Sequence, residues 1–158
     1  MKLMRTLRFD ASDDHVFEQA AGPDEWAVPG AFAFATLDET RLVGKTRQAF
    51  ANGFLSLESF GWATFVSVAE VTEPEHDRLA DRLAQHFLER YGAPDQAAAM
   101  AAARDEIAFA LDICAAPVNT VLAVSRRFDD DDQIHETFRT VPAPTADLHA
   151  RIWDVVEE

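Results

Sequence analysis

Alternating hydrophobic and polar residues mark the first third of the chain, interrupted by turn-forming residues. A period of two is typical of strands and predicts extended segments over 2–9, 15–20 and 26–35. The Asp- and Ser-rich residues 10–14 predict a turn after the first segment, since these side chains bond to nearby backbone groups. Pro29-Gly30 predicts a bulge or bend within the third segment.

The hydrophobic period lengthens to that of a helix in three later segments. These segments are 38–52, 72–91 and 94–116. In the second, Thr72 and Glu75 fit a capping box, and Gly92 fits a left-handed position that ends a helix. Pro94 suits the first turn of the third helix, where its missing N–H has no cost.

The remaining pattern predicts how a sheet is built. Segment 61–71 is hydrophobic on both faces, which is typical of a strand inside a covered sheet. Segments 119–128 and 134–141 predict a hairpin across an Asp-rich loop, and 146–156 predicts a closing helix. We therefore expect an α+β fold, with a mainly antiparallel sheet covered by helices, in a single domain over residues 1–158.

Composition favours a folded cytoplasmic protein. The chain has 158 residues, 48% of them hydrophobic and twelve of them Phe, which supplies a core and excludes a largely disordered chain. No apolar run is long enough to span a membrane, and the first residues alternate where a signal segment would be continuously apolar. The single cysteine, Cys114, excludes an intramolecular disulfide and lies among apolar residues, which predicts a buried, inert thiol.

The charge balance limits the partners. Asp and Glu number 28 against 14 Lys and Arg, a net charge of -14. Nucleic acids and anionic membranes are bound through Lys and Arg, so we expect neither as a partner. The larger part of the acidic excess lies after residue 70, which favours a basic partner there or simply keeps the protein soluble.

No catalytic motif is present. The five histidines form no HxxxH or HExxH pair, and phosphate-binding or nucleophile motifs rich in glycine are missing. The acidic run Asp129–Asp132 does not fit a calcium loop and predicts a solvated turn. We therefore assign no catalytic residue, metal ligand or cofactor, and an enzyme is the less favoured class. A metal site assembled from distant histidines stays open.

Aromatic residues of the first half are the candidate binding residues. Large aromatic side chains usually fill cores, but these also fit an apolar pocket or a partner-binding face. Glu25, Glu58, Arg41 or Arg47 would form its polar rim, and Phe50 and Phe54 belong to the wider set. The five candidates are Trp26, Phe32, Phe34, Phe60 and Trp62.

Two aromatic segments carry a family resemblance. Residues 25–34 (EWAVPGAFAF) and 59–64 (SFGWAT), with echoes at 1–6 and 137–140, resemble a small bacterial family of unknown function. The resemblance covers nearly the whole chain. It implies an accessory role near the maturation of molybdenum-dependent dehydrogenases, and it assigns no functional residues.

Three functional hypotheses follow. The leading one is a non-enzymatic accessory or binding protein that assists a larger enzyme, with a protein partner or with self-association through an edge strand or the Ala-rich helix. The alternative is a small enzyme or ligand carrier with an aromatic pocket, whose polar groups would include Glu70, His86, His135 and Arg139. In the third, the aromatic residues only fill a core.

Overall fold

Strand β1 (Lys2–Leu7) lies inside a seven-stranded sheet, between β2 (Trp26–Val28) and β5 (Phe65–Glu70). The computed structural model describes residues 1–142. All neighbouring strands are antiparallel, in the order β4-β3-β2-β1-β5-β6-β7. The other strands are β3 (Phe54–Ser56), β4 (Trp62–Ala63), β6 (Val121–Phe128) and β7 (Ile134–Val141). The predicted α+β class and antiparallel sheet are confirmed.

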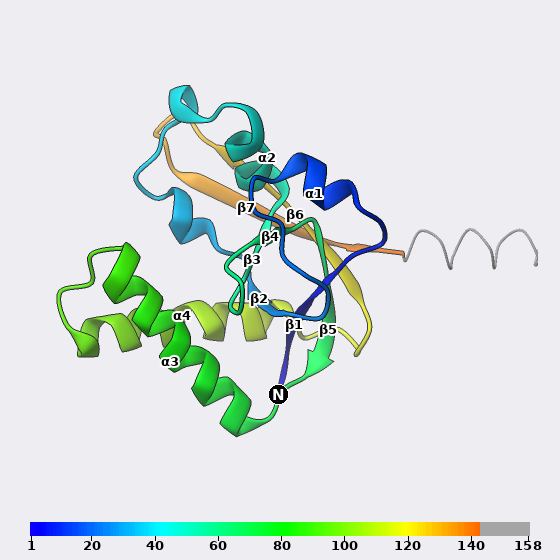
Figure 1. Ribbon diagram of the computed structural model, residues 1–158, viewed down its shortest axis with the longest axis vertical. Coiled ribbons are helices and arrows are strands. Elements are labelled where there is room, and N and C mark those ends of the chain that lie inside the picture. Colours follow the sequence, from blue (N-terminus) through cyan, green and yellow to red (C-terminus); the bar gives the residue numbers. More distant parts are fainter. Residues whose placement is uncertain (143–158) are drawn as a thin grey trace, which may run out of the picture.

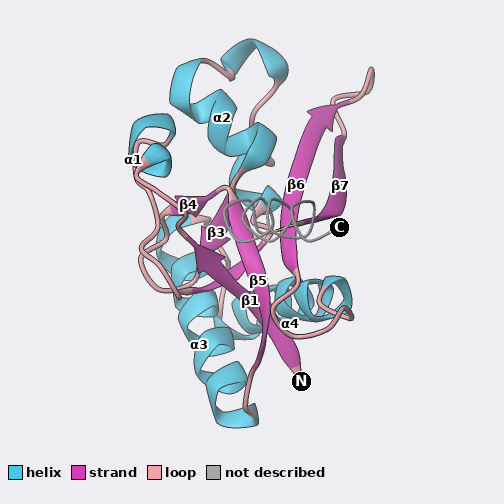
Figure 2. Ribbon diagram, turned by 90° about the vertical axis from the view of Figure 1, so that its right-hand side faces the viewer, coloured by secondary structure: helices cyan, strands magenta, loops and turns pink. Residues whose placement is uncertain are grey.

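The helices gather at the two ends of the sheet. Figures 1 and 2 show α3 and α4 at the end where the N-terminus lies, and α1 and α2 at the opposite end. The α-helices are α1 (Ser12–Val16), α2 (Gly44–Asn52), α3 (Glu73–Arg90) and α4 (Gln96–Ile113), with 3-10 turns η1 (Ala31–Phe34) and η2 (Glu39–Arg41). Within residues 1–142, no helix is both long and apolar enough to cross a membrane.

Helix α3 follows its sequence signals closely. The Thr72 hydroxyl accepts the Glu75 N–H (3.3 Å), and the Glu75 carboxylate accepts the Thr72 N–H (3.4 Å), so the predicted capping box is confirmed. Leu79, Leu83 and Phe87 are buried on its inner face. Gly92 has φ +71°, the left-handed conformation expected after the helix end.

Helix α4 packs against α3 and against the sheet through small residues. Ala99, Ala103 and Ala110 are fully buried, so the helices approach closely around Ile107. Its N-cap is Asp95, whose carboxylate accepts the Ala98 N–H at 2.8 Å. The prediction that Pro94 begins this helix was therefore early by two residues.

Of two predicted strands in the first third, one was wrong and the other was confirmed only over its first three residues. Residues 15–20 form no strand: Ser12–Val16 is the short helix α1, and only Ala20 forms a bridge, with Trp62. The strand predicted over 26–35 ends at Val28, because Gly30 adopts φ +83° and turns the chain into η1. Phe34 lies in η1 and is buried. The alternation of hydrophobic residues over 31–34 was too short to distinguish a strand from a helical turn.

Two further boundaries differ from the predictions. The helix predicted from 38 begins at Gly44, because η2 precedes it, and Phe54 opens β3 instead of belonging to that helix. The strand predicted over 61–71 is divided into β4 and β5 at Thr64, whose hydroxyl donates to Asp13 at 2.7 Å. The hairpin β6–β7 is confirmed, and the helix predicted over 146–156 lies outside the described residues.

Candidate functional site

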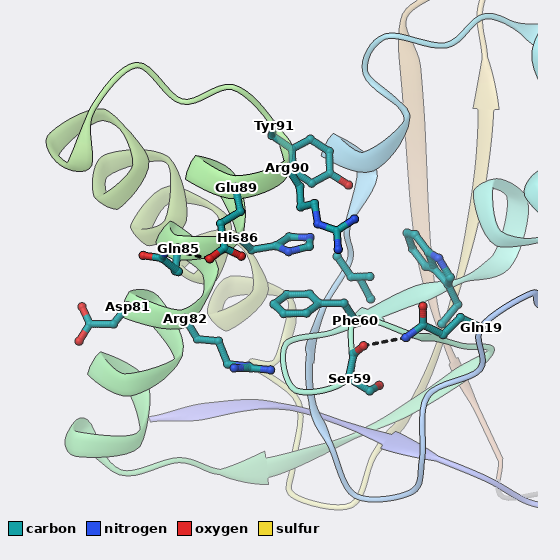
Figure 3. Close-up of a pocket in the computed structure, with 12 residues that line it drawn as sticks. Gln19, Ser59, Phe60, Asp81, Arg82, Gln85, His86, Glu89, Arg90 and Tyr91 are labelled. Carbon is teal, nitrogen blue, oxygen red and sulfur yellow. Dashed lines mark hydrogen bonds between the residues drawn. The ribbon is translucent and has the colours of Figure 1, made fainter.

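A pocket of about 620 Å³ opens between α3 and the tight turn that joins β3 to β4. Residues 57–61 form this turn, called the Phe60 turn below. Figure 3 shows that α3 supplies one wall, including Arg82, His86 and Arg90, with Tyr91 directly after the helix. The opposite wall comes from Gln19 and from the stretch that runs from β3 through this turn into β4. It contains Gln19, Leu55, Ser59, Phe60 and Trp62.

The Phe60 turn is held in an unusual conformation from two sides. Phe60 has φ +57°, a left-handed geometry that bulky residues rarely adopt. On one side, the Glu25 carboxylate accepts hydrogen bonds from the hydroxyls of Ser56 (2.7 Å) and Ser59 (2.6 Å). On the other, the Arg82 guanidinium donates to the carbonyls of Leu57 (2.7 Å) and Glu58. Such strain persists only where surrounding contacts enforce it.

These contacts place the Phe60 ring against α3. It stacks on the His86 imidazole with ring centroids 3.8 Å apart and planes 6° from parallel. The Arg82 guanidinium carbon lies 5.2 Å from the Phe60 centroid, and in Figure 3 the ring lies between His86 and Arg82. Tyr91 extends the aromatic wall, 5.3 Å from His86 and 5.3 Å from Phe32.

The charged groups of the pocket are unequally paired. Arg82 is engaged with the Phe60 turn, and the Glu89 carboxylate accepts a hydrogen bond from Gln85 at 2.8 Å. Within residues 1–142, Arg90 takes part in no hydrogen bond or ion pair. Burial lowers the pKa of His86, and the neighbouring Arg90 charge lowers it further, which favours a neutral imidazole. Burial raises the pKa of Tyr91, so its hydroxyl remains a donor.

Trp62 connects the pocket with a second, smaller cavity. Its ring packs close to two glycines: a Cβ on Gly30 would lie 3.3 Å from it, and one on Gly53 would lie 2.9 Å from it. The ring also contacts Phe34, with centroids 5.1 Å apart. The cavity on this side has a volume of about 200 Å³ and includes Lys45 in its lining.

The structure separates the five aromatic residues predicted to bind a ligand or partner. Phe60 and Trp62 line the pocket. Phe32 supports its edge through Phe87 and Tyr91, and Phe34 lines the smaller cavity. Trp26 is 2% exposed and lies in the main core, where its Nε1–H donates to Glu75 at 3.2 Å.

The residues proposed as a polar rim have other positions. Glu25 braces the Phe60 turn, and Glu58 accepts the Trp26 N–H at 2.9 Å. Neither Arg41 nor Arg47 lines the pocket, and Arg47 donates to the Leu42 carbonyl at 3.2 Å.

The alternative set of converging polar groups is dispersed over the sheet and α3. Of Glu70, His86, His135 and Arg139, His86 alone lines the pocket. Glu70 lies opposite Lys2 in the β1–β5 register, and Arg139 lies opposite Ala123 in the hairpin. His135 is 2.6 Å from Asp129 across the hairpin loop.

Sequence reasoning did not single out Arg82, Arg90 or Tyr91. Arg82, His86 and Arg90 are spaced by four residues along α3, which places them on one stripe of the helix. That spacing was visible in the sequence, but nothing there indicated that the Phe60 turn lies opposite this stripe.

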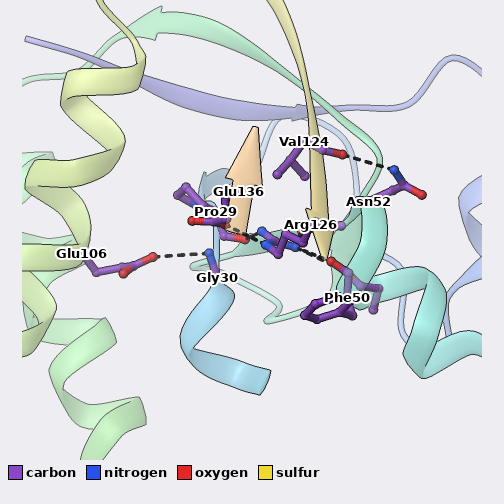
Figure 4. A network of polar contacts seen from close by, with 10 residues as sticks. Pro29, Gly30, Phe50, Asn52, Glu106, Val124, Arg126 and Glu136 are labelled. Carbon is purple, nitrogen blue, oxygen red and sulfur yellow. Dashed lines mark hydrogen bonds and ion pairs between the residues drawn. The ribbon is translucent and has the colours of Figure 1, made fainter. Parts of the chain in front are cut away.

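A second polar cluster is buried between α4, α2 and the hairpin, and we call it the Arg126 cluster (Figure 4). The fully buried Arg126 side chain pairs with Glu136 at 2.7 Å. Its guanidinium also donates to the carbonyls of Phe50 (3.0 Å), Gly53 (2.7 Å) and Pro29. On α4, Glu106 accepts the Gly30 N–H at 3.3 Å, and burial raises the pKa of its carboxyl group.

Metal and thiol chemistry find little support in the part of the chain that the structure describes. No three His, Cys, Asp or Glu side chains gather there as a metal site. Cys114 is 1% exposed, and burial raises the pKa of its thiol to about 12. This environment stabilises the protonated thiol over the reactive thiolate.

Fold and pocket together define an α+β protein with an antiparallel sheet and an open pocket lined by aromatic and charged residues of both signs. Residues 1–154 match the model of a family described as "Family of unknown function (DUF6505)", and the chain belongs to this family. Comparison with curated proteins and with solved structures gives no match. The resemblance to a family of unknown function is thereby confirmed.

Proposed function

We propose that this protein binds a small organic molecule in the pocket between α3 and the Phe60 turn, as a binding module or ligand carrier. The pocket volume of about 620 Å³ lies within the range of small-molecule sites, roughly 300–1,000 Å³. Its walls combine flat aromatic surface from Phe60, Trp62 and Tyr91 with donors from α3. This combination of stacking surface and a few polar groups is typical of such sites.

The strained Phe60 turn carries the proposal. A glycine would adopt φ +57° at no steric cost, yet the chain has Phe there and braces it through Glu25 and Arg82. The result is an aromatic ring fixed at the pocket wall and stacked on His86. Backbone strain of this kind gathers at ligand-binding sites, where it keeps a side chain in the binding geometry.

A ligand screen with matched variants tests the proposal. A library of small metabolites is titrated into the protein while the indole N–H resonance of Trp62 is followed by NMR. We expect a saturable shift with at least one compound, and its loss in Phe60→Ala. Phe109→Ala is the matched control, because Phe109 is 42% exposed and does not line the pocket.

The proposal fails if no compound shifts Trp62, or if Phe60→Ala binds as tightly as the natural chain. Circular dichroism of both variants establishes that they are folded.

An accessory role toward a larger molybdenum-type enzyme, a cytoplasmic location and self-association belong to the same proposal. The first is supported by the family resemblance, the cytoplasmic location by composition, and self-association by an edge strand or the Ala-rich helix as a pairing surface. Light scattering after gel filtration tests self-association, where a monomer mass would contradict it. Capture from native extract tests the accessory role, which requires recovery of a larger enzyme and its loss in Phe60→Ala.

A further inference from the structure

Two arginines of α3 reach the pocket wall, and they have different surroundings. Arg82 uses its Nε–H and one terminal N–H on the carbonyls of Leu57 and Glu58, so it fixes the Phe60 turn. Arg90 lines the same pocket two helical turns later, and within residues 1–142 it meets neither a carbonyl nor a carboxylate. Arg82 is thus hydrogen-bonded to the pocket wall, whereas the N–H donors of Arg90 are available to a ligand.

Arg90 differs from the other unpaired arginines by its position in the pocket. Within residues 1–142, six arginine side chains take part in no hydrogen bond or ion pair, and Arg90 is the one among them that lines the pocket; the others are Arg41, Arg78, Arg104, Arg127 and Arg139. The two acidic residues of the pocket form no ion pair with Arg90: Glu89 accepts from Gln85, and Asp81 lies well apart from Arg90 in Figure 3. Within residues 1–142, no acidic side chain neutralises the Arg90 charge by an ion pair, so its donors face the pocket without a partner from this part of the chain.

The neighbours of Arg90 also offer donors. Tyr91 follows it directly, and its hydroxyl has no hydrogen-bond partner within the described residues. On the opposite wall, the donors of Gln19 and Ser59 are already used: Gln19 donates to the Ser59 carbonyl at 2.9 Å, and Ser59 donates to Glu25. The Arg90 guanidinium and the Tyr91 hydroxyl thus lie together, at the C-terminal end of α3.

We infer that the ligand of this pocket carries a carboxylate group, which Arg90 binds with support from the Tyr91 hydroxyl. This inference rests on the proposed function, because it names the chemical class of the same ligand. The planar guanidinium fork matches a carboxylate in two parallel hydrogen bonds. Phe60 and Trp62 then contact the apolar body of the ligand, so the expected class is a small aromatic or otherwise apolar carboxylic acid.

Other anions fit this pocket less well. A phosphate group carries up to two charges, and the pocket has one available guanidinium for it. Nucleic acids and anionic membranes bind through many basic residues, which the net charge of -14 opposes. A small carboxylate needs one cation and one donor, as Arg90 and Tyr91 provide.

Paired probes test the inference on the full chain. Phenylacetate and indole-3-acetate are compared with their neutral amides and with phenyl phosphate, and dissociation constants are measured from NMR shifts. We expect each carboxylate to bind about ten-fold more tightly than its amide, the scale of a hydrogen-bonded charged pair. Phenyl phosphate is expected to bind more weakly than the carboxylates.

Three variants locate the effect. Arg90→Gln should remove the preference for carboxylate over amide, and Arg90→Lys should restore part of it. Arg78→Gln removes the same charge from an exposed position of α3 outside the pocket, and should keep the full preference. Added salt should weaken carboxylate binding and leave amide binding unchanged.

The outcomes separate this inference from the proposed function. Equal binding of acids and amides, or an unchanged preference in Arg90→Gln, overturns the carboxylate assignment and leaves a small-molecule pocket. Stronger binding of phenyl phosphate overturns it in favour of a phosphate ligand. Absence of binding by every probe also overturns it, and the proposed function then stands or falls by the metabolite screen.

Discussion

Arg90 lies in the pocket and Arg126 in the buried Arg126 cluster, and the same type of side chain has a different role in each region. In the Arg126 cluster, the guanidinium pairs with Glu136 and donates to carbonyls from α2 and from the β2–η1 connection. In the pocket, Arg90 is exposed and meets no partner within residues 1–142. Both regions lie near Trp62, which packs against Gly30 and lines the pocket.

The difference shows how partners decide a role. A buried charge is tolerated only when its partners replace water, so Arg126 is bound on all sides and ties distant elements together. An exposed charge has no such requirement, so Arg90 can remain without a partner until a ligand arrives. The number of satisfied donors thus separates a structural arginine from one available for binding.

The largest expected effect comes from removing Arg126. Arg126→Ala leaves Glu136 and at least three carbonyls buried without their donor, and we expect a loss of about 3–5 kcal/mol in the free energy of unfolding. Urea denaturation measures it. Arg127→Ala is the control, because Arg127 is exposed on the same strand and should cost less than about 0.5 kcal/mol. Equal effects of the two would contradict the assigned difference.

Gly30 tests the link between the two regions. It has φ +83°, and a Cβ there would lie 2.6 Å from the Leu55 Cβ and 3.3 Å from the Trp62 ring. Gly30→Ala should therefore lower the free energy of unfolding by about 2–3 kcal/mol and change the Trp62 indole resonance. Gly92→Ala shares the left-handed φ (+71°) without any close atom, and should cost about 1 kcal/mol. A Trp62 resonance that stays unchanged in Gly30→Ala would refute the link.

Glu106 gives the Arg126 cluster a pH dependence. Burial raises the pKa of its carboxyl group in the folded protein, so the protonated form favours folding and this contribution is lost as the pH rises through the folded pKa. Glu106→Gln keeps an acceptor for the Gly30 N–H without the charge. Relative to the natural chain, it should be nearly neutral at about pH 4 and more stable by up to about 1 kcal/mol near pH 8. A difference in stability that is constant with pH would contradict this cause.

The smallest expected effect on stability is that of Arg90. Arg90→Gln should change the free energy of unfolding by less than about 0.5 kcal/mol, because Arg90 is exposed and the change breaks no hydrogen bond or ion pair within residues 1–142. It should raise the pKa of His86 toward its ordinary value, since the Arg90 charge lowers that pKa; Glu89 and Arg82 remain, and burial keeps part of the shift. Proton NMR of the His86 ring measures it. Arg78→Gln should leave the His86 pKa unchanged.

Local patterns predicted those elements whose stability is decided within a few residues. The capping box at Thr72 and Glu75, the glycine after α3 and the β6–β7 hairpin follow from side chains that contact their own neighbours. The short strand β3 and the turn η1 were missed because their conformations depend on partners far along the chain. Trp62 and Leu55, for example, occupy the space that a side chain at Gly30 would need.

The amino-acid sequence by itself determined the α+β class, the acidic charge, the main helices and the supply of aromatic residues. Tertiary structure decided which aromatics are core and which line a pocket: Trp26 became buried, and Phe60 was fixed opposite His86. It also decided that the Arg126 side chain is buried and paired, whereas the Arg90 side chain is exposed. The physical reason is range, because periodicity and capping act over a few residues, whereas burial and the pairing of charges depend on segments brought together only by the fold.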